Sequence, residues 1–282
     1  MKLILLTTLT MFAFASNSVL NRMAIDGGHI DPSSFAAFRI IAGVVALVLL
    51  LAMRHEKLPL WEKPRIVGAL SLAAYMVGFS LAYASLDAGI GALILFGVVQ
   101  MTLFTYGGLR GTTPTKRELV GASIAFVGLL IALWPNEDSA ATLSGTVLMV
   151  VAGLGWAAYT LAGQGAKSPL ASTAANFVLA MPLLLLLLIG QTLSMSVTGI
   201  ALAVLAGAIT SGMGYALWYS VLPKMNQSTA AIVQLSVPII AIVAGAILLG
   251  EVISLSVIVA AGLVIGGIGF AVTKRSVQAG RT

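Results

Sequence analysis

Neutral polar and aromatic side chains lie inside long apolar stretches of this chain, and their types suit the binding of a ligand. Polar groups in such stretches are costly, so we treat them as candidates for function. Aromatic walls with a few amide and hydroxyl groups suit an amphipathic small molecule, whereas a multiply charged phosphate ester calls for Arg or Lys clamps. The candidates for binding a solute are Asn17, Asn21, Tyr75, Phe79, Gln100, Trp156, Tyr159, Tyr215 and Gln234.

Each of these side chains also has a structural interpretation. Tyr75 and Phe79 are four residues apart, so they share a helix face that lines either a solute pathway or a helix contact. A buried amide such as Asn17 must find hydrogen-bond partners, which a solute or a neighbouring helix can supply. Aromatic residues near helix ends form interfacial belts, and we favour that interpretation for Trp61 and Trp134.

Catalytic and metal chemistry lacks the residues that it needs. Every Asp and Glu lies in a predicted loop or at a helix end, His29 and His55 lie in predicted loops, and the chain has no cysteine. A buried serine therefore has no base beside it, and a metal ion has no cluster of ligands. No carboxylate lies where it could relay protons through the apolar stretches. We predict no enzymatic activity, no cofactor and no metal site.

The composition indicates that these residues belong to membrane helices. Hydrophobic residues make up 59% of the 282-residue chain, charged residues make up 9%, and the mean hydropathy is +1.06. Soluble proteins carry about 25% charged residues, and a membrane helix needs about 20 mostly apolar residues. The chain is thus predicted to be an all-α membrane protein with ten transmembrane helices, at residues 3–25, 33–53, 66–86, 90–109, 117–135, 144–164, 172–193, 197–221, 228–249 and 255–273.

Charged residues alternate between the two ends of these spans. Lys and Arg gather at one end, as at Arg54, while the opposite loops hold acidic residues such as Asp87 and Glu251. The positive-inside rule then places both termini in the cytoplasm of a multi-pass protein in a bacterial inner membrane. The net charge of +6 follows from this distribution, so we predict no nucleic-acid partner. A cleaved signal peptide ending near Ala15 is the alternative, but the apolar stretch continues to Ile25.

Two arginines break the alternation. Arg22, at the outer end of the first predicted span, can pair with Asp26 one turn further on, which would be a structural role. Arg39 lies about two turns into the second predicted span. There it either snorkels or pairs structurally, which we favour, or it contributes a positive field to a solute pathway.

An internal repeat divides the chain into two halves. Residues 78–86 and 214–222 share glycine, leucine, tyrosine and leucine at matching positions, and each segment closes the third of five predicted spans. A similar offset places Phe14 near Trp156. Because five is odd, the halves 1–135 and 144–273 must be inverted relative to each other, with 274–282 as a cytoplasmic tail. Inverted repeats recur in transporters, whose substrates bind near the membrane midplane between the repeats.

Backbone features indicate where helices bend and touch. Pro238 removes a backbone hydrogen bond within a predicted span, so we predict a hinge there. Gly262 and Gly266 form a small-xxx-small pair, which predicts close helix packing or a dimer contact. We therefore expect a monomer or a weak dimer.

Several stretches resemble motifs of the drug/metabolite transporter superfamily, specifically its EamA-type members. They are Phe14–Asn17, Phe38-Arg39, Gly121–Gly128, Gly155–Tyr159, and Pro238 with the terminal Leu249-Gly250-Glu251. The resemblance covers nearly the whole chain, and it departs at Gln100, where family members often carry proline. It implies a ten-helix fold of two inverted five-helix repeats, a central cavity, and export of amino acids or related metabolites. Within the family, the aromatic candidates point to the bacterial aromatic amino-acid exporters.

These observations together predict a membrane exporter that works by alternating access without a buried proton relay. Its partners would be a small-molecule solute, such as an amino acid or related metabolite, and the lipid bilayer. A multidrug exporter is the nearest alternative, although it would normally use a buried carboxylate. A sugar-phosphate exchanger is disfavoured because the predicted cavity lacks Lys and Arg. A non-transporting membrane scaffold would leave the polar midplane residues unexplained.

Overall fold

Apolar α-helices account for nearly all of the described chain. The computed structural model describes residues 2–109, 115–133, 142–163, 166–225, 233–234 and 236–272. Within these ranges the one strand-like pairing is an isolated bridge between Ile30 and Met195. The α-helices are α1 (Lys2–Asp26), α2 (Pro32–Met53), α3 (Lys63–Ala82), α4 (Ala88–Leu109), α5 (Lys116–Leu133), α6 (Leu143–Gly163), α7 (Pro169–Leu185), α8 (Val197–Leu205), α9 (Gly214–Val221), α11 (Ser236–Leu249) and α12 (Leu255–Val272).

One long span changes its helix type along its length. Between α8 and α9 the backbone forms a π-helix, η2 (Ala206–Met213), and short 3₁₀ turns follow α7 and α9 as η1 (Leu186–Leu188) and η3 (Leu222–Lys224). The elements α8, η2, α9 and η3 form one apolar run, Val197–Lys224, which we call the α8–α9 span. π-helical segments are rare and often lie at functional sites.

The described helices agree with an all-α membrane protein. Seven are long and apolar enough to cross a membrane: Lys2–Asp26, Pro32–Met53, Pro64–Ala82, Ala88–Leu109, Leu143–Gly163, Pro169–Leu188 and Val197–Lys224. Three shorter apolar helices, Leu119–Gly128, Ser236–Leu249 and Leu255–Ala271, fall within the other three predicted spans. Each predicted span therefore contains an apolar helix in the part of the chain that the structure describes, while ten crossings and their inversion stay predictions.

Local capping chemistry explains where α2 begins. The Asp31 Oδ1 atom accepts a hydrogen bond from the Ser34 amide at 2.9 Å, and Pro32 occupies the first turn, where its missing N–H costs nothing. The second oxygen, Oδ2, accepts from the Ser194 amide at 3.0 Å, which ties the loop after α7 to the start of α2. Partial burial tends to raise the pKa of Asp31, but these hydrogen bonds outweigh it and the net pKa is lowered.

The predicted seventh span, 172–193, is shifted in the structure. Its helix begins at Pro169, because the Ser168 side chain accepts a hydrogen bond from the Ala171 amide and caps this end. Its helical run ends at Leu188, and Gly190 then takes a positive φ of 73°, which reverses the chain. Hydropathy alone could not place these ends, because it does not record a capping serine or a glycine at positive φ.

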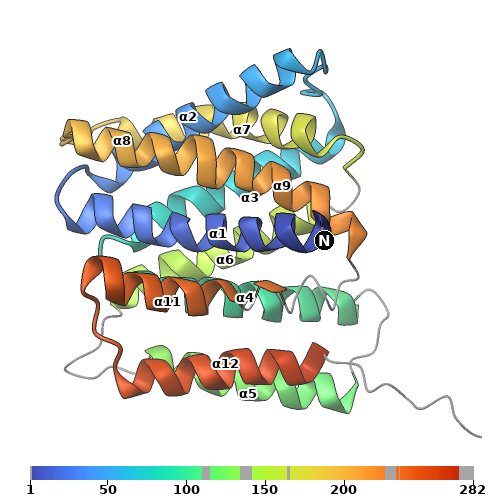
Figure 1. Cartoon of the computed structure of the whole chain (residues 1–282), viewed down its shortest axis with the longest axis vertical. Coiled ribbons are helices and arrows are strands. Elements are labelled where there is room, and N and C mark those ends of the chain that lie inside the picture. Colours follow the sequence, from blue (N-terminus) through green and yellow to red (C-terminus); the bar gives the residue numbers. More distant parts are fainter. Residues whose placement is uncertain are drawn as a thin grey trace, which may run out of the picture.

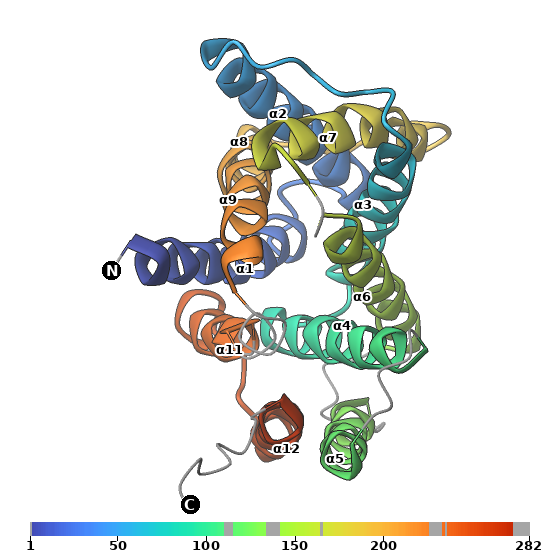
Figure 2. The ribbon, with the colours of Figure 1, turned by 90° about the vertical axis from the view of Figure 1, so that its right-hand side faces the viewer.

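The helices run side by side, and Figure 1 shows α1 beginning and α12 ending at the same end of the bundle. Figure 2, seen from the side, shows α5 and α12 together at one edge, with α4 and α11 between them and the other helices. Helices at matching positions in the two halves make matching contacts. Each of α2, α4 and α5 packs against its counterpart, which is α7, α11 and α12, respectively. The contact of α3 with α6 is matched by that of α9 with α1, and the contact of α4 with α6 is matched by that of α11 with α1.

Glycines let α2 and the α8–α9 span approach closely. A Cβ atom on Gly207 would overlap the carbonyl oxygen of Arg39, and one on Gly43 would lie 3.1 Å from the Gly207 carbonyl oxygen. Close contact through small residues is the usual way in which membrane helices associate. This contact brings the π-helix η2 directly against the helix that carries Arg39.

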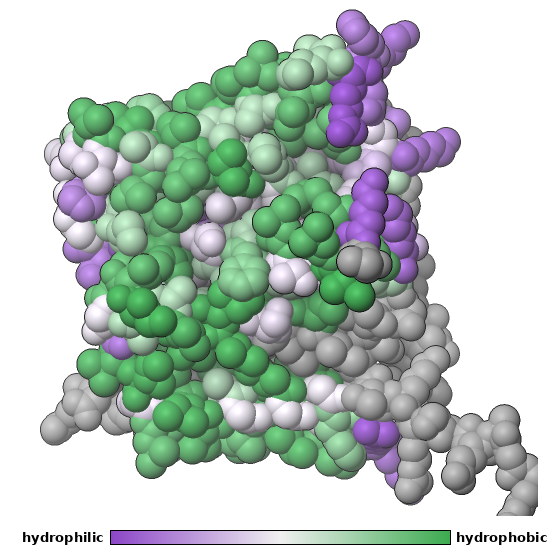
Figure 3. All heavy atoms as spheres, viewed as in Figure 1, coloured by the Kyte–Doolittle hydropathy of each residue, from purple (hydrophilic) through white to green (hydrophobic). Residues whose placement is uncertain are grey.

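The outer surface of the bundle is apolar along the length of the helices. Figure 3 shows a face that is mainly hydrophobic, with hydrophilic residues gathered towards the ends of the helices. Large side chains such as Ile4 at 72% and Ile247 at 75% exposure point outward from α1 and α11. Such a surface suits lipid and would be unfavourable in water.

Candidate functional site

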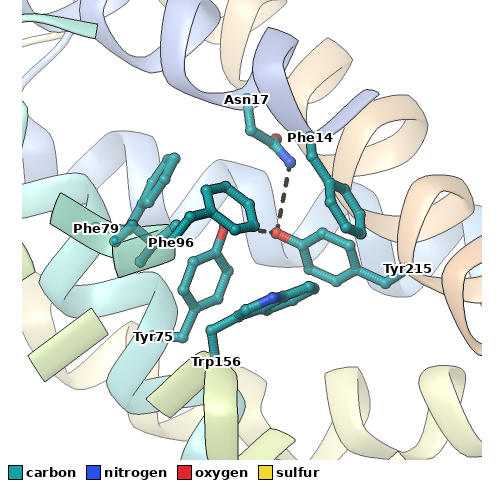
Figure 4. A pocket seen from close by; sticks show the side chains of 8 residues that line it. Phe14, Asn17, Tyr75, Phe79, Phe96, Trp156 and Tyr215 are labelled. Carbon is teal, nitrogen blue, oxygen red and sulfur yellow. Dashed lines mark hydrogen bonds between the residues drawn. The ribbon is translucent and has the colours of Figure 1, made fainter. Parts of the chain in front are cut away.

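A small cavity lies inside the bundle between helices that belong to both halves of the sequence. Its volume is about 10 Å³, close to the least that holds one water molecule. Helices α1, α3 and α4 supply most of its wall, and α6 and α9 supply the rest (Figure 4). The residues that line it are Phe14, Asn17, Tyr75, Phe79, Leu95, Phe96, Trp156 and Tyr215.

Aromatic rings form most of the cavity wall. The Trp156 ring lies 4.7 Å from the Tyr215 ring, 5.0 Å from the Tyr75 ring and 5.2 Å from the Phe14 ring, measured between centroids. The Phe14 and Trp156 planes meet at 86°, the edge-to-face geometry that aromatic pairs favour. These contacts join α1, α3, α6 and α9 around one point, as Figure 4 shows.

Asn17 connects this aromatic wall to the π-helix. The hydroxyls of Thr210 and Ser211 donate to its Oδ1 at 2.5 Å and 3.1 Å. Its Nδ2 donates to the Thr210 carbonyl at 3.3 Å and to the Tyr215 hydroxyl at 3.5 Å. The buried amide therefore finds partners on a neighbouring helix while it also lines the cavity, so both interpretations of Asn17 from the sequence are compatible with this geometry.

Arg39 lies fully buried behind the cavity wall. Its Nε donates to the Ser211 hydroxyl at 2.8 Å, and its Nη2 donates to the hydroxyls of Tyr215 at 2.8 Å and Tyr75 at 3.2 Å. Its guanidinium carbon lies 4.9 Å from the centroid of the Phe79 ring, a cation–π distance. Of the two roles favoured for Arg39 from the sequence, the structure shows structural pairing and not snorkelling, because hydroxyl groups inside the bundle supply partners for the guanidinium.

The other predicted binding residues are buried without lining this cavity. Asn21, one turn beyond Asn17, donates to the Ser80 hydroxyl at 3.3 Å. Tyr159 stacks on the Trp156 ring at 5.5 Å and so supports the wall from outside. Gln100 and Gln234 are both 1% exposed and are not among the lining residues. Whether any of these four contacts a solute stays a prediction.

The predicted hinge, Pro238, lies close to the described start of α11, Ser236–Leu249, and residues 233–234 just before it are also helical. Residue 235 and residues 226–232 lie outside the described residues, so the hinge stays a prediction.

Three cavity residues were missing from the sequence-based candidates. Leu95 and Phe96 lie in the mostly apolar helix α4, where Gln100, one turn beyond Phe96, was a signal that could have marked this inward face. Phe14 could have been found, because the repeat already placed it near Trp156. Arg39 was identified as unusual but was not assigned to the site, because hydropathy does not tell which way a side chain on α2 points.

A cluster of charged groups lies at the end of the bundle where α1 ends. Arg22 pairs with Asp26 at 3.3 Å, as predicted, and also with Asp87 at 3.2 Å. Glu251 lies 3.9 Å from Arg22 and accepts the Ala88 amide at 2.7 Å, at the start of α4. Burial raises the pKa of Glu251 above its usual range, and the Ala88 hydrogen bond and the Arg22 charge oppose this only in part. Burial likewise raises the pKa of Asp87, against the opposing charge of Arg22.

The family model for EamA-like transporters matches this chain twice, at residues 1–134 and at residues 143–273. The chain belongs to the EamA-like transporter family. It is therefore a transporter of the drug/metabolite transporter superfamily and a multi-pass membrane protein, in a family whose members move small molecules and are not enzymes.

Relatives of this EamA-like transporter span almost the same length. An uncharacterized protein of Pseudomonas aeruginosa is 44% identical over 99% of this chain and 97% of its own length. An uncharacterized transporter of Archaeoglobus fulgidus is 27% identical over 87% of this chain and 90% of its own. A probable amino-acid metabolite efflux pump of Salmonella typhimurium is 22% identical over 95% and 96%, respectively.

The fold of this EamA-like transporter is also similar to a crystal structure. The two superpose with a TM-score of 0.68 and share 12% sequence identity, and the match covers 96% of this chain and 97% of the other. At that identity the similarity concerns the fold alone.

Proposed function

We propose that this transporter exports small metabolites, with amino acids favoured and aromatic amino acids foremost, by alternating access. The observation that carries the proposal is the aromatic cavity around Trp156, which receives residues from both of the segments that match the family model. Its rings suit an apolar side chain, and Asn17 and the tyrosine hydroxyls suit polar groups at the other end of the solute. The Salmonella relative, described as a probable amino-acid metabolite efflux pump, supports the same solute class.

The proposed architecture has ten membrane spans in two inverted five-helix repeats, residues 1–135 and 144–273, with both termini in the cytoplasm of a bacterial cell. Two observations support it: the family model matches twice, and the helix contacts are reciprocal between the halves. In an inverted pair of repeats the solute site lies at their junction, which is where Phe14 meets Trp156. Pro238 is the proposed hinge, and Asn21, Gln100, Tyr159 and Gln234 would form an outer layer of the site.

The cavity must enlarge before it can hold such a solute, because its volume of about 10 Å³ leaves room for roughly one water molecule. Alternating access supplies that change: the two halves move apart on one side of the site at a time. Contacts between halves at the cavity, such as the hydrogen bond of 2.8 Å from the Tyr215 hydroxyl to the Tyr75 hydroxyl, would break and form again in each cycle.

Transport would run down the solute gradient or by exchange. The groups described around the cavity are hydroxyls, an amide, aromatic rings and the Arg39 guanidinium, with no carboxylate or imidazole among them to carry a proton. A test compares solute flux into proteoliposomes with and without an imposed pH gradient. We expect the two fluxes to differ by less than about twofold, and strong stimulation by the gradient would contradict this part of the proposal.

The main experiment measures uptake of labelled aromatic, small neutral and basic amino acids into proteoliposomes. We expect saturable flux of the aromatic members, reduced by substitution of Trp156. Empty liposomes supply the background, and thermal unfolding in detergent shows that each preparation is folded. Folded protein that moves no member of the panel would refute the amino-acid assignment.

A further inference from the structure

We propose that Arg39 is the binding partner for a carboxylate on the transported solute, so that the site selects molecules with one carboxylate attached to an apolar or aromatic body. This inference rests on the proposed function, since it names the chemical class that the cavity accepts. Sequence motifs and relatives do not assign this role, and it follows from four features of the site.

The first feature is a positive charge without a negative partner. Arg39 is 0% exposed, and its partners are the hydroxyls of Ser211, Tyr75 and Tyr215. Among the described residues no carboxylate lies within 4 Å of its guanidinium, whereas Arg22 has three such carboxylates and Arg65 has one. A buried charge is costly unless an opposite charge compensates it. An anionic ligand would supply that missing compensation.

The second feature is unused hydrogen-bonding capacity. The Nη1 atom of Arg39 is buried and has no hydrogen-bond partner among the described residues. A guanidinium donates along a fork, and a carboxylate can accept two parallel hydrogen bonds from it. The hydroxyls that contact Arg39 satisfy Nε and Nη2 and leave Nη1 available for one arm of such a pair.

The third feature is the position of Arg39 directly behind the cavity. Three lining residues touch it: Tyr75 and Tyr215 through their hydroxyls, and Phe79 through its ring. The Tyr215 hydroxyl donates to the Tyr75 hydroxyl at 2.8 Å, so this pair stands between the cavity and the guanidinium. The two tyrosines belong to different halves, and separation of the halves would open the guanidinium to the cavity.

The fourth feature is the balance of charge, which limits the ligand to a single negative charge. Among the described residues, Arg39 is the cationic group that hydrogen-bonds the cavity wall, and the lining residues themselves are aromatic, apolar or amide. A phosphate ester with two negative charges would therefore remain partly uncompensated. No acidic side chain lies in the described wall to hold an ammonium group, so the solute's amino group matters less than its carboxylate.

The test compares matched small molecules that differ only in charge. Purified protein in detergent at pH 7.5 is titrated with 3-phenylpropionate, with 3-phenylpropionamide and with phenethylamine, and binding is followed by calorimetry. We expect the carboxylate to bind about 10- to 100-fold more tightly than the amide, which is the range for one charge-assisted hydrogen-bonded pair. We expect phenethylamine to bind no better than the amide.

Arg39→Gln should abolish this preference, so that carboxylate and amide bind within about twofold of each other. The matched control is Arg65→Gln, since Arg65 is also a buried arginine but bonds the Ser172 carbonyl and Glu62, away from the cavity. That variant should keep the wild-type preference. A preference that persists in Arg39→Gln, or wild-type protein that binds all three molecules equally or none, would overturn the inference.

Arg39→Lys provides a second measurement if the glutamine variant fails to fold. Lysine keeps the charge but lacks the fork, so carboxylate binding should weaken about tenfold while amide binding stays unchanged. Equal weakening of both ligands would overturn the inference. Measurements of flux distinguish the transport proposal from the Arg39 proposal. Carboxylate binding without flux of any solute refutes the transport proposal alone. Flux that is indifferent to the carboxylate refutes the Arg39 proposal alone.

Discussion

Replacement of Asn17 by alanine distinguishes a transport site from a merely structural polar core. The Asn17 amide takes part in four hydrogen bonds, with the Thr210 hydroxyl and carbonyl, the Ser211 hydroxyl and the Tyr215 hydroxyl. Because it also lines the cavity, its loss should affect both the stability of the protein and its flux. A membrane scaffold without a solute would show only the effect on stability.

The expected cost in stability follows from the partners that remain. The Thr210 hydroxyl still reaches the Ala206 carbonyl at 3.0 Å, and the Tyr215 hydroxyl keeps Tyr75 and Arg39. The Ser211 hydroxyl continues to accept from Arg39 but loses its acceptor. One buried donor left unsatisfied costs about 1–3 kcal/mol, so Asn17→Ala should lower the free energy of unfolding by about that amount.

The assay combines thermal unfolding in detergent with flux into proteoliposomes at equal amounts of folded protein. Loss of one hydrogen bond to the solute costs about 1 kcal/mol, which predicts a roughly fivefold loss of flux at low solute concentration. The matched control is Asn176→Ala, a buried asparagine on α7 that contacts Arg65 at 3.5 Å and lies away from the cavity. If both variants lose stability and both keep full flux, the reasoning about Asn17 is refuted.

Three further perturbations test other parts of the structure. Gly207→Ala forces a Cβ against the Arg39 carbonyl, so we expect about 1–3 kcal/mol less stability; an unchanged Tm would refute the close contact. Burial raises the pKa of Glu251 in the folded protein, so its protonated carboxyl group stabilises the fold below the ordinary pKa of a glutamate. This stabilisation is lost as the pH rises through the raised pKa of the folded state. Glu251→Gln should remove that part of the pH dependence in unfolding scans from pH 4 to 8, and an unaltered profile would count against it. Asn21→Ala, which loses a bond to Ser80, should reduce flux less than Asn17→Ala does, because Asn21 lies in the outer layer of the site; an equal loss would place Asn21 at the cavity itself.

The sequence was informative where a pattern has one physical interpretation. Apolar stretches of about 20 residues predicted the helices, because lipid requires that length of apolar chain. The repeat placed Phe14 near Trp156, and their rings lie 5.2 Å apart. The spacing of four residues between Arg22 and Asp26 predicted an ion pair, which the structure confirms at 3.3 Å.

Other features depend on packing, which hydropathy does not record. Helix α4 is mostly apolar, so hydropathy alone does not tell Leu95 and Phe96 from lipid-facing residues, although Gln100 lies one turn beyond Phe96. The π-helix η2 arises where glycine at 207 lets two backbones approach, and its local sequence carries no rule that predicts it. For Arg39 the sequence left snorkelling and structural pairing open, and hydropathy could not place the hydroxyls on α3, η2 and α9 that pair with it.

The tight aromatic packing at the cavity also bears on leakage across the membrane. The rings of Phe14, Trp156 and Tyr215 leave this cavity space for about one water molecule, too little for a connected chain of water molecules inside it. Protons and small ions cross a bilayer along connected water, and this arrangement of the rings offers no such path within the cavity. We expect idle copies of the protein that keep this packing to dissipate little of the voltage across the membrane.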